Sequence, residues 1–175
     1  MSLAGKTALV TGASRGIGKA IALQLGAQGA TVIGTATSEG GAAAISQYLA
    51  DAGIQGVGLV LDVCSDESVA AVFARIQADF GAPLVLVNNA GITRDNLAMR
   101  LKDEDWQTVI ETNLSAVFRL SRAVIRPMMK ARWGRIINIT SVVGHSGNPG
   151  QSNYAAAKAG VAGMSRALAR ELGSR

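Results

Sequence analysis

A strand, a glycine-rich turn and a helix open the chain, and this arrangement most restricts the folds available to it. Residues 6–11 form a short apolar run, KTALVT, that predicts a buried strand. Gly12, Gly16 and Gly18 follow, and a helical pattern then continues through Gln28. Glycines at the start of a helix let a phosphate group reach backbone N–H groups. The pattern therefore predicts a nucleotide-binding turn, with a tight structural turn as the alternative.

The glycine spacing is G-x-x-x-G-x-G, which differs from the G-x-G-x-x-G of longer dinucleotide-binding enzymes. If the turn holds a pyrophosphate, its residues are the first candidates for cofactor contacts. They are Gly12, Ser14, Arg15, Gly16, Ile17 and Gly18.

The end of the second predicted strand, residues 30–35, favours NADP over NAD. An NAD-binding domain usually places Asp or Glu here to bind the ribose 2′-hydroxyl. This chain instead has the run TATS, which includes Thr37, and Arg15 lies in the preceding turn. Hydroxyl and guanidinium groups suit a 2′-phosphate. Glu39 is the nearest competitor for a ribose contact.

A carboxylate follows the third predicted strand, residues 56–61, which comes after a predicted helix at 39–52. Asp62 and Val63 stand where a doubly wound sheet receives its ligand, and Asp62 could accept a hydrogen bond from an adenine amino group. Asp62 could equally cap the next predicted helix, residues 65–80. Both interpretations stay open at this point.

The fourth predicted strand, residues 84–87, ends in two amides and a small turn. The sequence there is Asn88, Asn89, Ala90 and Gly91. Buried amides need several hydrogen-bond partners each, so this composition is unusual for a plain loop. We expect the turn to contribute to the same ligand site.

A long helical pattern covers residues 103–131 and includes one polar residue among apolar neighbours, Asn113. The spacing predicts burial of its large apolar residues. They are Trp106, Val109, Ile110, Leu114, Val117, Phe118 and Val124. An Asn inside a helix is mildly unfavourable, so its side chain should contact something polar, and a neighbouring backbone would suffice.

A Tyr–Lys pair follows the fifth predicted strand, residues 135–139, and the hydroxyl of Ser141. Tyr154 and Lys158 are four residues apart at the start of a predicted helix, so they share a face. Tyrosine ordinarily ionises near pH ~10, but a neighbouring ammonium group favours the phenolate. Tyr154 is therefore a candidate general acid or base. The spacing alone also suits a helix with a buried Tyr and a solvated Lys.

Composition excludes several classes of protein. The chain has 175 residues, a formal charge of +5, one Cys and one His, so neither an internal disulfide nor a zinc site is expected. Its basic residues are scattered, which makes a nucleic-acid partner improbable. The first residues, MSLAGKTALV, lack a signal-peptide pattern, and no apolar run is long enough for a membrane span. We expect a soluble, cytoplasmic protein.

Taken together, the motifs resemble those of the short-chain dehydrogenases/reductases in order and spacing. The resemblance covers the whole chain and implies an α/β fold with a doubly wound, Rossmann-like parallel sheet of strand order 3-2-1-4-5. It implies one NADP-binding domain at 1–175, with strands six and seven and a substrate lid expected only beyond Arg175. Strand five would then be an apolar edge, which favours aggregation. One departure is Leu84, where the family usually has Asp before the NNAG turn.

The sequences of these motifs most resemble those of family members that reduce 3-oxoacyl thioesters of acyl-carrier protein with NADPH, in fatty-acid synthesis. This resemblance implies that Tyr154 donates a proton to the developing alkoxide and that Ser141 orients the carbonyl. It further implies that Lys158 favours the ionised phenol and binds ribose hydroxyls, and that Asn113 holds a water in a proton relay. Alternatives are reduction of acyl-CoA or other small carbonyls, or a non-catalytic nucleotide-binding fragment.

The same resemblance implies a homotetramer and an acidic carrier protein as partner. Arg132 and Arg175 are candidates for docking this carrier near the mouth of the cleft. Gly160 and Gly163 interrupt the last predicted helix, which indicates that another backbone or helix approaches there, as at a subunit contact.

Overall fold

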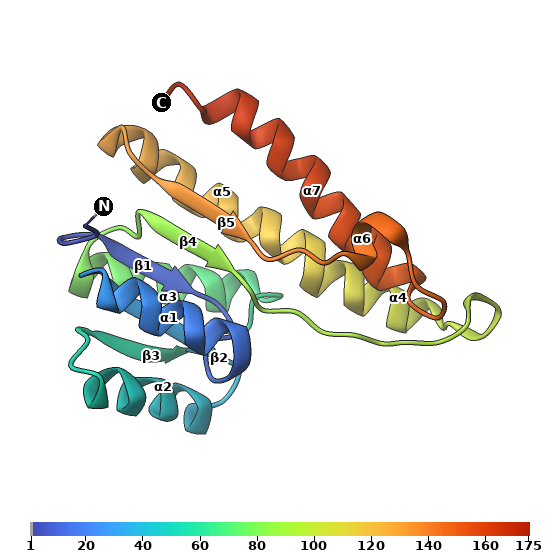
Figure 1. Cartoon of the computed structure of the whole chain (residues 1–175), viewed down its shortest axis with the longest axis horizontal. Coiled ribbons are helices and arrows are strands. Elements are labelled where there is room, and N and C mark those ends of the chain that lie inside the picture. The colour runs from blue at the N-terminus through green and yellow to red at the C-terminus, as the bar shows by residue number, and fades with distance from the viewer. Residues whose placement is uncertain (1) are drawn as a thin grey trace.

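A computed structural model describes residues 2–175 of the chain and shows a parallel α/β sheet (Figure 1). The described residues form one sheet of strand order β3-β2-β1-β4-β5, and every neighbouring pair is parallel. The strands are β1 (Thr7–Val10), β2 (Thr31–Ala36), β3 (Gly56–Val60), β4 (Val85–Asn88) and β5 (Arg135–Asn138). This order confirms the predicted doubly wound fold, in which the direction of winding reverses between β1 and β4.

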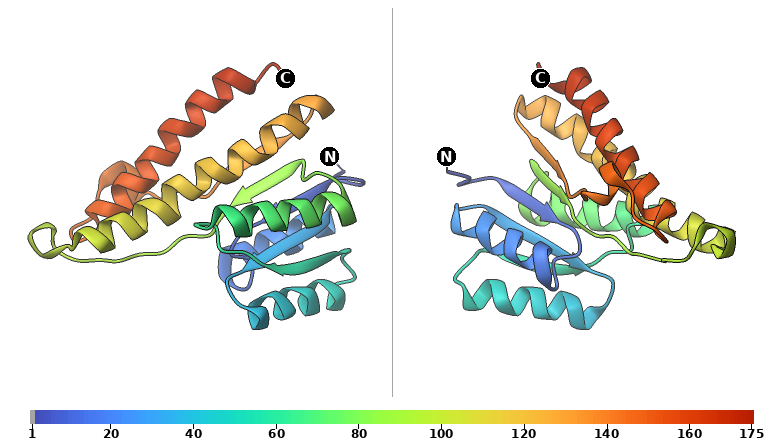
Figure 2. Two further views of the ribbon diagram at one scale, coloured as in Figure 1. Left: turned by 180° about the vertical axis from the view of Figure 1, so that it is seen from behind. Right: turned by 45° about the vertical axis from the view of Figure 1, so that its right-hand side comes forward.

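Helices cover both faces of the sheet (Figure 2). On one face lie α1 (Gly16–Ala27) and α2 (Glu39–Asp51), and on the other lie α3 (Asp66–Phe80) and α5 (Ala116–Ala131). The remaining helical elements are η1 (Ala98–Arg100), α4 (Asp103–Ile110), η2 (Glu111–Ser115), α6 (Val143–Ser146) and α7 (Ser152–Leu172). Helix α7 packs against α6, α4 and η2, at the side of the molecule where β5 is the last strand.

Alternating side chains of the buried strands divide the core into two layers, as the period of two in a strand requires. Leu9 and Ile33 face α3 and α5, whereas Val10 and Val32 face α1 and α2. Both layers hold fully buried aliphatic residues, so β1 and β2 form the rigid centre of the domain. The functional loops extend from the carboxyl ends of these strands.

The long helix predicted at 103–131 is interrupted by a π-helical turn, η2 (Glu111–Ser115). Val109, Val117 and Val124 are buried as predicted, but the prediction was wrong for Trp106 and Phe118, which are 39% and 44% exposed. A π-helical turn inserts an extra residue into the helix, so a regular spacing of apolar residues no longer marks one face across it.

Strand β5 is an edge strand of the described sheet, as predicted, and Ile137 on it is 43% exposed. Of the two glycines of α7, Gly160 confirms the expected close approach and Gly163 does not. A Cβ atom at Gly160 would lie 2.9 Å from a side-chain carbon of Leu114, so helix η2 does approach closely there. At Gly163 the nearest atom is 3.9 Å away, on Arg166 of the same helix, so the predicted neighbour is absent among residues 2–175.

Among the described residues, 2–175, no helix is both long and apolar enough to cross a membrane.

Candidate active site

The predicted site residues gather along the carboxyl edge of the sheet. Parallel strands place the segments that follow them at a common edge, and this is where doubly wound domains bind ligands. The glycine-rich turn follows β1, Thr37 follows β2, Asp62 follows β3, Asn89 follows β4 and Ser141 follows β5.

Each glycine of the glycine-rich turn disfavours a side chain, by close contact at Gly18 and by a positive φ angle at Gly12 and Gly16. A Cβ atom at Gly18 would lie 2.2 Å from the carbonyl oxygen of Gly12, and Gly12 and Gly16 have φ angles of +63° and +56°. At Gly16 a Cβ would meet nothing within 4 Å among residues 2–175, so open space faces the first turn of α1. No capping side chain fills the start of this helix within the described chain, and its first turn carries no acidic residue. These features fit an anionic ligand such as a pyrophosphate.

Thr11 and Asn89 connect this turn to the end of β4, a contact that sequence reasoning missed. Thr11 Oγ1 accepts hydrogen bonds from the backbone N–H groups of Asn89 and Ala90, each at 3.0 Å. Asn89 Nδ2 in return donates to the carbonyl oxygens of Thr11 and Gly12, each at 3.0 Å. Asn89 therefore stabilises the glycine-rich turn and binds it to the end of β4. The partners are nearly 80 residues apart, so no local pattern could have indicated them.

The residues predicted to select NADP lie on neighbouring segments, with Arg15 in the turn after β1 and Thr37 after β2. Arg15 and Thr37 are both exposed, and Ser14 is half-buried. A Cβ atom at Gly41 in α2 would lie 3.8 Å from Ser14 Cβ and 3.2 Å from Ser38 Oγ, which places the glycine-rich turn against the start of α2. Thr37 immediately precedes this start.

Asp62 is exposed and does not cap helix α3, so the capping interpretation was wrong. Ser65 is the N-cap, and its hydroxyl accepts a hydrogen bond from Ser68 N. Asp62 Oδ1 instead accepts from Cys64 N at 2.9 Å, within the loop that follows β3. Asp62 lies three residues before the N-cap, because Val63 and Cys64 still belong to that loop. Val63 is buried in the core beside it.

Asn113 is fully buried and holds the turn that follows β4. Its Nδ2 donates to Ile92 O at 2.7 Å, and its Oδ1 accepts from Ile92 N at 2.9 Å. A Cβ atom at Gly91 would lie 3.1 Å from Asn113 Oδ1 and 3.9 Å from Lys158 Nζ. Gly91, Asn113 and the amine of Lys158 therefore meet in a small space.

Lys158 is 6% exposed, and its Nζ donates to Ile139 O at 2.7 Å. The same Nζ lies 5.6 Å from the centre of the Tyr154 ring, so the two side chains are on one side of α7. Burial lowers the pKa of Lys158, because the ammonium form loses hydration. A buried amine beside a half-buried phenol is an arrangement suited to proton transfer.

Gly144 brings the Ser141 segment close to α7, and the sequence analysis did not identify it. A Cβ atom at Gly144 would lie 2.9 Å from Ala159 N and 2.9 Å from Lys158 Cβ. Ser141 Oγ accepts from Val143 N at 3.2 Å, which orients the hydroxyl at the start of this segment. A glycine within a polar loop gives no sequence signal for such an approach.

Asn153 is the second missed residue, and it fixes the start of α7. It is fully buried, its Nδ2 donates to Arg94 O at 2.9 Å, and its Oδ1 accepts from Tyr154 N at 2.8 Å. Nearby, Asn96 N donates to Gly150 O at 2.9 Å. The segment after β4 is thus bound to the segment that carries Tyr154.

Arg132 and Arg175 do not lie near this site, which corrects the expectation of a place at the cleft mouth. Both line a groove with Trp133 and Leu172 where α5 and α7 end. Tyr154 is near the start of α7, which spans 21 residues or about 30 Å. The two arginines are at the far end because α5 and α7 both run back from the carboxyl edge of the sheet.

The fold and the site define a class: a nucleotide-binding α/β domain with a Tyr–Lys pair at the carboxyl edge of its sheet. The sequence profile described as "short chain dehydrogenase" matches residues 6–175. The chain belongs to the short-chain dehydrogenase family, which uses a nicotinamide cofactor.

Several curated relatives are similar over all or nearly all of the chain. The chain is 67% identical to the 3-oxoacyl-[acyl-carrier-protein] reductase FabG of Pseudomonas aeruginosa, across 100% of this chain and 71% of that protein. It is 65% identical to the protein of the same name from Escherichia coli K12, across 100% and 70%. For the Haemophilus influenzae protein of that name the identity is 61%, across 98% and 69%.

Proposed function

We propose that the protein reduces the ketone of 3-oxoacyl-[acyl-carrier-protein] to the 3-hydroxyacyl thioester, with NADPH as reductant, in fatty-acid synthesis. The observation that carries the proposal is the position of Lys158 Nζ, buried beside the Tyr154 ring and 3.9 Å from where a Cβ of Gly91 would lie. High identity to reductases of this name supports the substrate.

The chain's own residues fit the proposed cofactor. The glycine-rich turn offers the pyrophosphate open space at Gly16, at the start of α1, where a Cβ would meet nothing within 4 Å among residues 2–175. Asp62 and Val63 would contact the adenine, and Ala90 and Gly91 the nicotinamide half. Arg15 and Thr37 would bind a ribose 2′-phosphate, with Ser14 and Ile17 completing the contacts.

In the proposed mechanism NADPH supplies the hydride, and the protein supplies the proton and the orientation. Ser141 would donate a hydrogen bond to the ketone oxygen and hold it toward Tyr154. Tyr154 would give its phenolic proton to that oxygen as negative charge develops. Lys158 would favour the resulting phenolate by its charge and would bind ribose hydroxyls.

Asn113 would fix the position of the Gly91 turn relative to Lys158. Its side-chain amide already pairs with the backbone of Ile92. In the proposed relay the N–H of Asn113 Nδ2 that is not bound to Ile92 would donate a hydrogen bond to a water, and that water would deliver a proton to Lys158.

We further propose a cytoplasmic homotetramer that accepts the acidic carrier protein at Arg132 and Arg175. Arg132 follows α5 and Arg175 follows α7, and both line the groove at the end of α7 farthest from Tyr154. This helix spans 21 residues or about 30 Å. Docking there would therefore serve the Tyr154 of another subunit. Raised salt should increase the Michaelis constant for the carrier-bound substrate.

A substrate comparison tests the proposal. NADPH oxidation is followed with acetoacetyl groups on acyl-carrier protein and on coenzyme A, and each is repeated with NADH. We expect the highest kcat/KM with the carrier thioester and NADPH. Preference for the coenzyme A thioester would favour the acyl-CoA alternative, and binding of NADPH without turnover would favour a nucleotide-binding fragment. Equal or better use of NADH would refute the roles of Arg15 and Thr37.

A further inference from the structure

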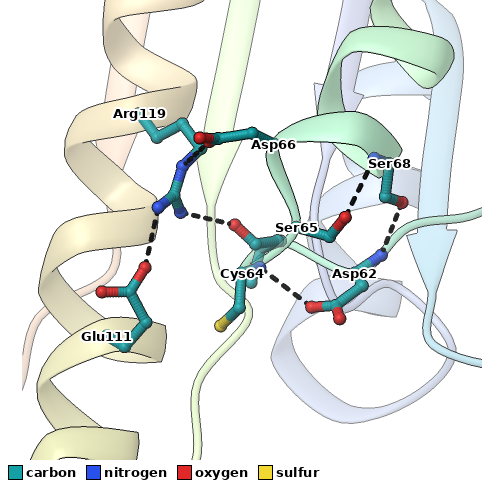
Figure 3. Close-up of polar contacts among 8 residues, drawn as sticks. Asp62, Cys64, Ser65, Asp66, Ser68, Glu111 and Arg119 are labelled. Atoms are coloured by element: carbon teal, nitrogen blue, oxygen red, sulfur yellow. Dashed lines mark hydrogen bonds and ion pairs between the residues drawn. The ribbon is translucent and has the colours of Figure 1, made fainter.

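Arg119 of α5 binds the loop that follows β3, the first residue of α3 and the first residue of η2 (Figure 3). Its Nε pairs with Asp66 Oδ1 at 2.5 Å, and its Nη1 donates to Val63 O at 2.9 Å. Its Nη2 pairs with Glu111 Oε1 at 2.7 Å. The three nitrogens of one guanidinium group are thus each engaged, although the side chain is 19% exposed.

The bound loop is the one that the proposed function assigns to the adenine ring. Figure 3 shows Asp62, Cys64 and Ser65 in a tight turn between β3 and α3, with the guanidinium group of Arg119 between this turn and α5. Within the turn Asp62 Oδ1 accepts from Cys64 N, and Asp62 N donates to Ser68 Oγ at 3.1 Å. These bonds fix the shape of the turn. Arg119 fixes where the turn lies relative to the helix behind it.

Arg119 also binds the π-helical turn η2, through Glu111. Glu111 is the first residue of η2, which carries Asn113 two positions later. Thr112 Oγ1 also lies 3.4 Å from Cys64 Sγ, so the turn touches the same loop at a second point. The loop after β3 is therefore held from α5 and η2, and η2 also binds the turn after β4 through Asn113.

We propose that Arg119 is a positioning residue for cofactor binding, which holds the Asp62–Asp66 loop where the adenine half of the nucleotide binds. This inference rests on the proposed function. Three acceptors in different directions require the planar fork of arginine, because the ammonium group of a lysine is a compact donor at the end of a flexible chain. Charge alone would not reproduce the contact.

Calorimetric titration of the protein with adenosine 2′,5′-bisphosphate tests the inference, because this ligand contains the adenine half of NADP alone. We expect Arg119→Met to weaken its binding about tenfold, or ~1.4 kcal/mol. Arg119→Lys should resemble the Met variant more than the parent. Arg75→Met is the matched control, since Arg75 pairs with Asp79 at the other end of α3 and both are exposed. It should bind like the parent.

Kinetics separate positioning from a purely structural role. With Arg119→Met the KM for NADPH should rise while kcat at saturating NADPH changes less than about twofold. A lower free energy of unfolding with parental affinity for the bisphosphate would refute the inference. If the Met variant does not fold, parental affinity in Arg119→Lys would refute it equally. A parent protein that binds no bisphosphate would refute the proposed function itself, and this inference with it.

Discussion

The side chain of Asn113 and the backbone of Ile92 form a closed pair of hydrogen bonds. Asn113 Nδ2 donates to Ile92 O at 2.7 Å, and Ile92 N donates to Asn113 Oδ1 at 2.9 Å. The Asn113 side chain thus supplies both hydrogen-bond partners that the backbone N–H and carbonyl of Ile92 would otherwise find in a strand or helix. The pair connects the π-helical turn to the segment that follows β4, and it brings Gly91 against Lys158.

Replacement of Asn113 by Ala should therefore destabilise the fold. Loss of both bonds leaves the N–H and carbonyl of Ile92 without their partner, and we expect a loss of about 2 kcal/mol in the free energy of unfolding. Asn96→Ala is the control, because Asn96 makes similar bonds to Arg100 O and Leu97 N on an exposed loop. Its effect should be under about 1 kcal/mol in urea titrations. Equal losses for the two variants would contradict this role.

Gly144 should tolerate no side chain. In Gly144→Ala the new methyl group would press on Ala159 N and on Lys158 Cβ, each 2.9 Å from its ideal position. The Ser141 segment would move away from α7, and we expect kcat to fall at least tenfold with NADPH affinity nearly unchanged.

Gly163→Ala is the matched control in α7, where the added atom meets only Arg166 at 3.9 Å among residues 2–175. It should stabilise the helix by up to ~1 kcal/mol and leave kcat unaffected. Parental kcat in the Gly144 variant would show that close packing at α6 is not needed for turnover.

Tyr48 should make stability depend on pH in the alkaline range. Its hydroxyl donates to Ala13 O at 2.9 Å, and burial raises its pKa from 10.0 to about 12. The folded state therefore favours the protonated phenol, so this contribution is fully present below pH 10 and is lost as the pH rises toward 12.

Urea unfolding at pH 9 and pH 11 measures this contribution. The parent should lose on the order of 1 kcal/mol more than Tyr48→Phe between these values. Tyr48→Phe itself should be about 1 kcal/mol less stable at neutral pH, because Ala13 O loses its donor. An identical pH dependence in both proteins would contradict the assignment.

The buried ammonium group of Lys158 should lower the free energy of unfolding, in addition to its proposed role in catalysis. Because burial lowers its pKa, the ammonium form opposes folding below that pKa, and the penalty is relieved as the pH rises toward the ordinary value of 10.5. Lys158→Met removes the buried charge, so its free energy of unfolding at pH 7 should equal or exceed that of the parent by about 1 kcal/mol. Turnover should be lost. A variant that is clearly less stable would show that the bond to Ile139 O dominates.

Local patterns in the sequence were sufficient to predict the sheet and the location of the site. An apolar run that stops at a glycine cluster marks β1 and its turn, and the order of the remaining strands follows from repeated strand–helix units. The Tyr154 and Lys158 spacing likewise predicted a shared face. These features depend on neighbours within about one or two helical turns.

Contacts between distant segments were not predictable in this way. Thr11 and Asn89 join the ends of the neighbouring strands β1 and β4, Gly144 packs on α7, and Asn153 binds a segment almost 60 residues earlier. The exposure of Phe118 was missed because a π-helical turn changes the phase of the apolar pattern, and no residue type signals such a turn. Tertiary packing determines each of these features.

Turnover by Tyr154→Phe tests the central claim, that the phenol beside Lys158 donates the proton. The variant keeps the ring, which packs 5.6 Å from Lys158 Nζ, and removes the hydroxyl alone. With acetoacetyl acyl-carrier protein and saturating NADPH we expect kcat to fall by ~10²–10⁴-fold, the usual contribution of a general acid, with the dissociation constant for NADPH almost unchanged. A kcat equal to that of the parent would contradict the account.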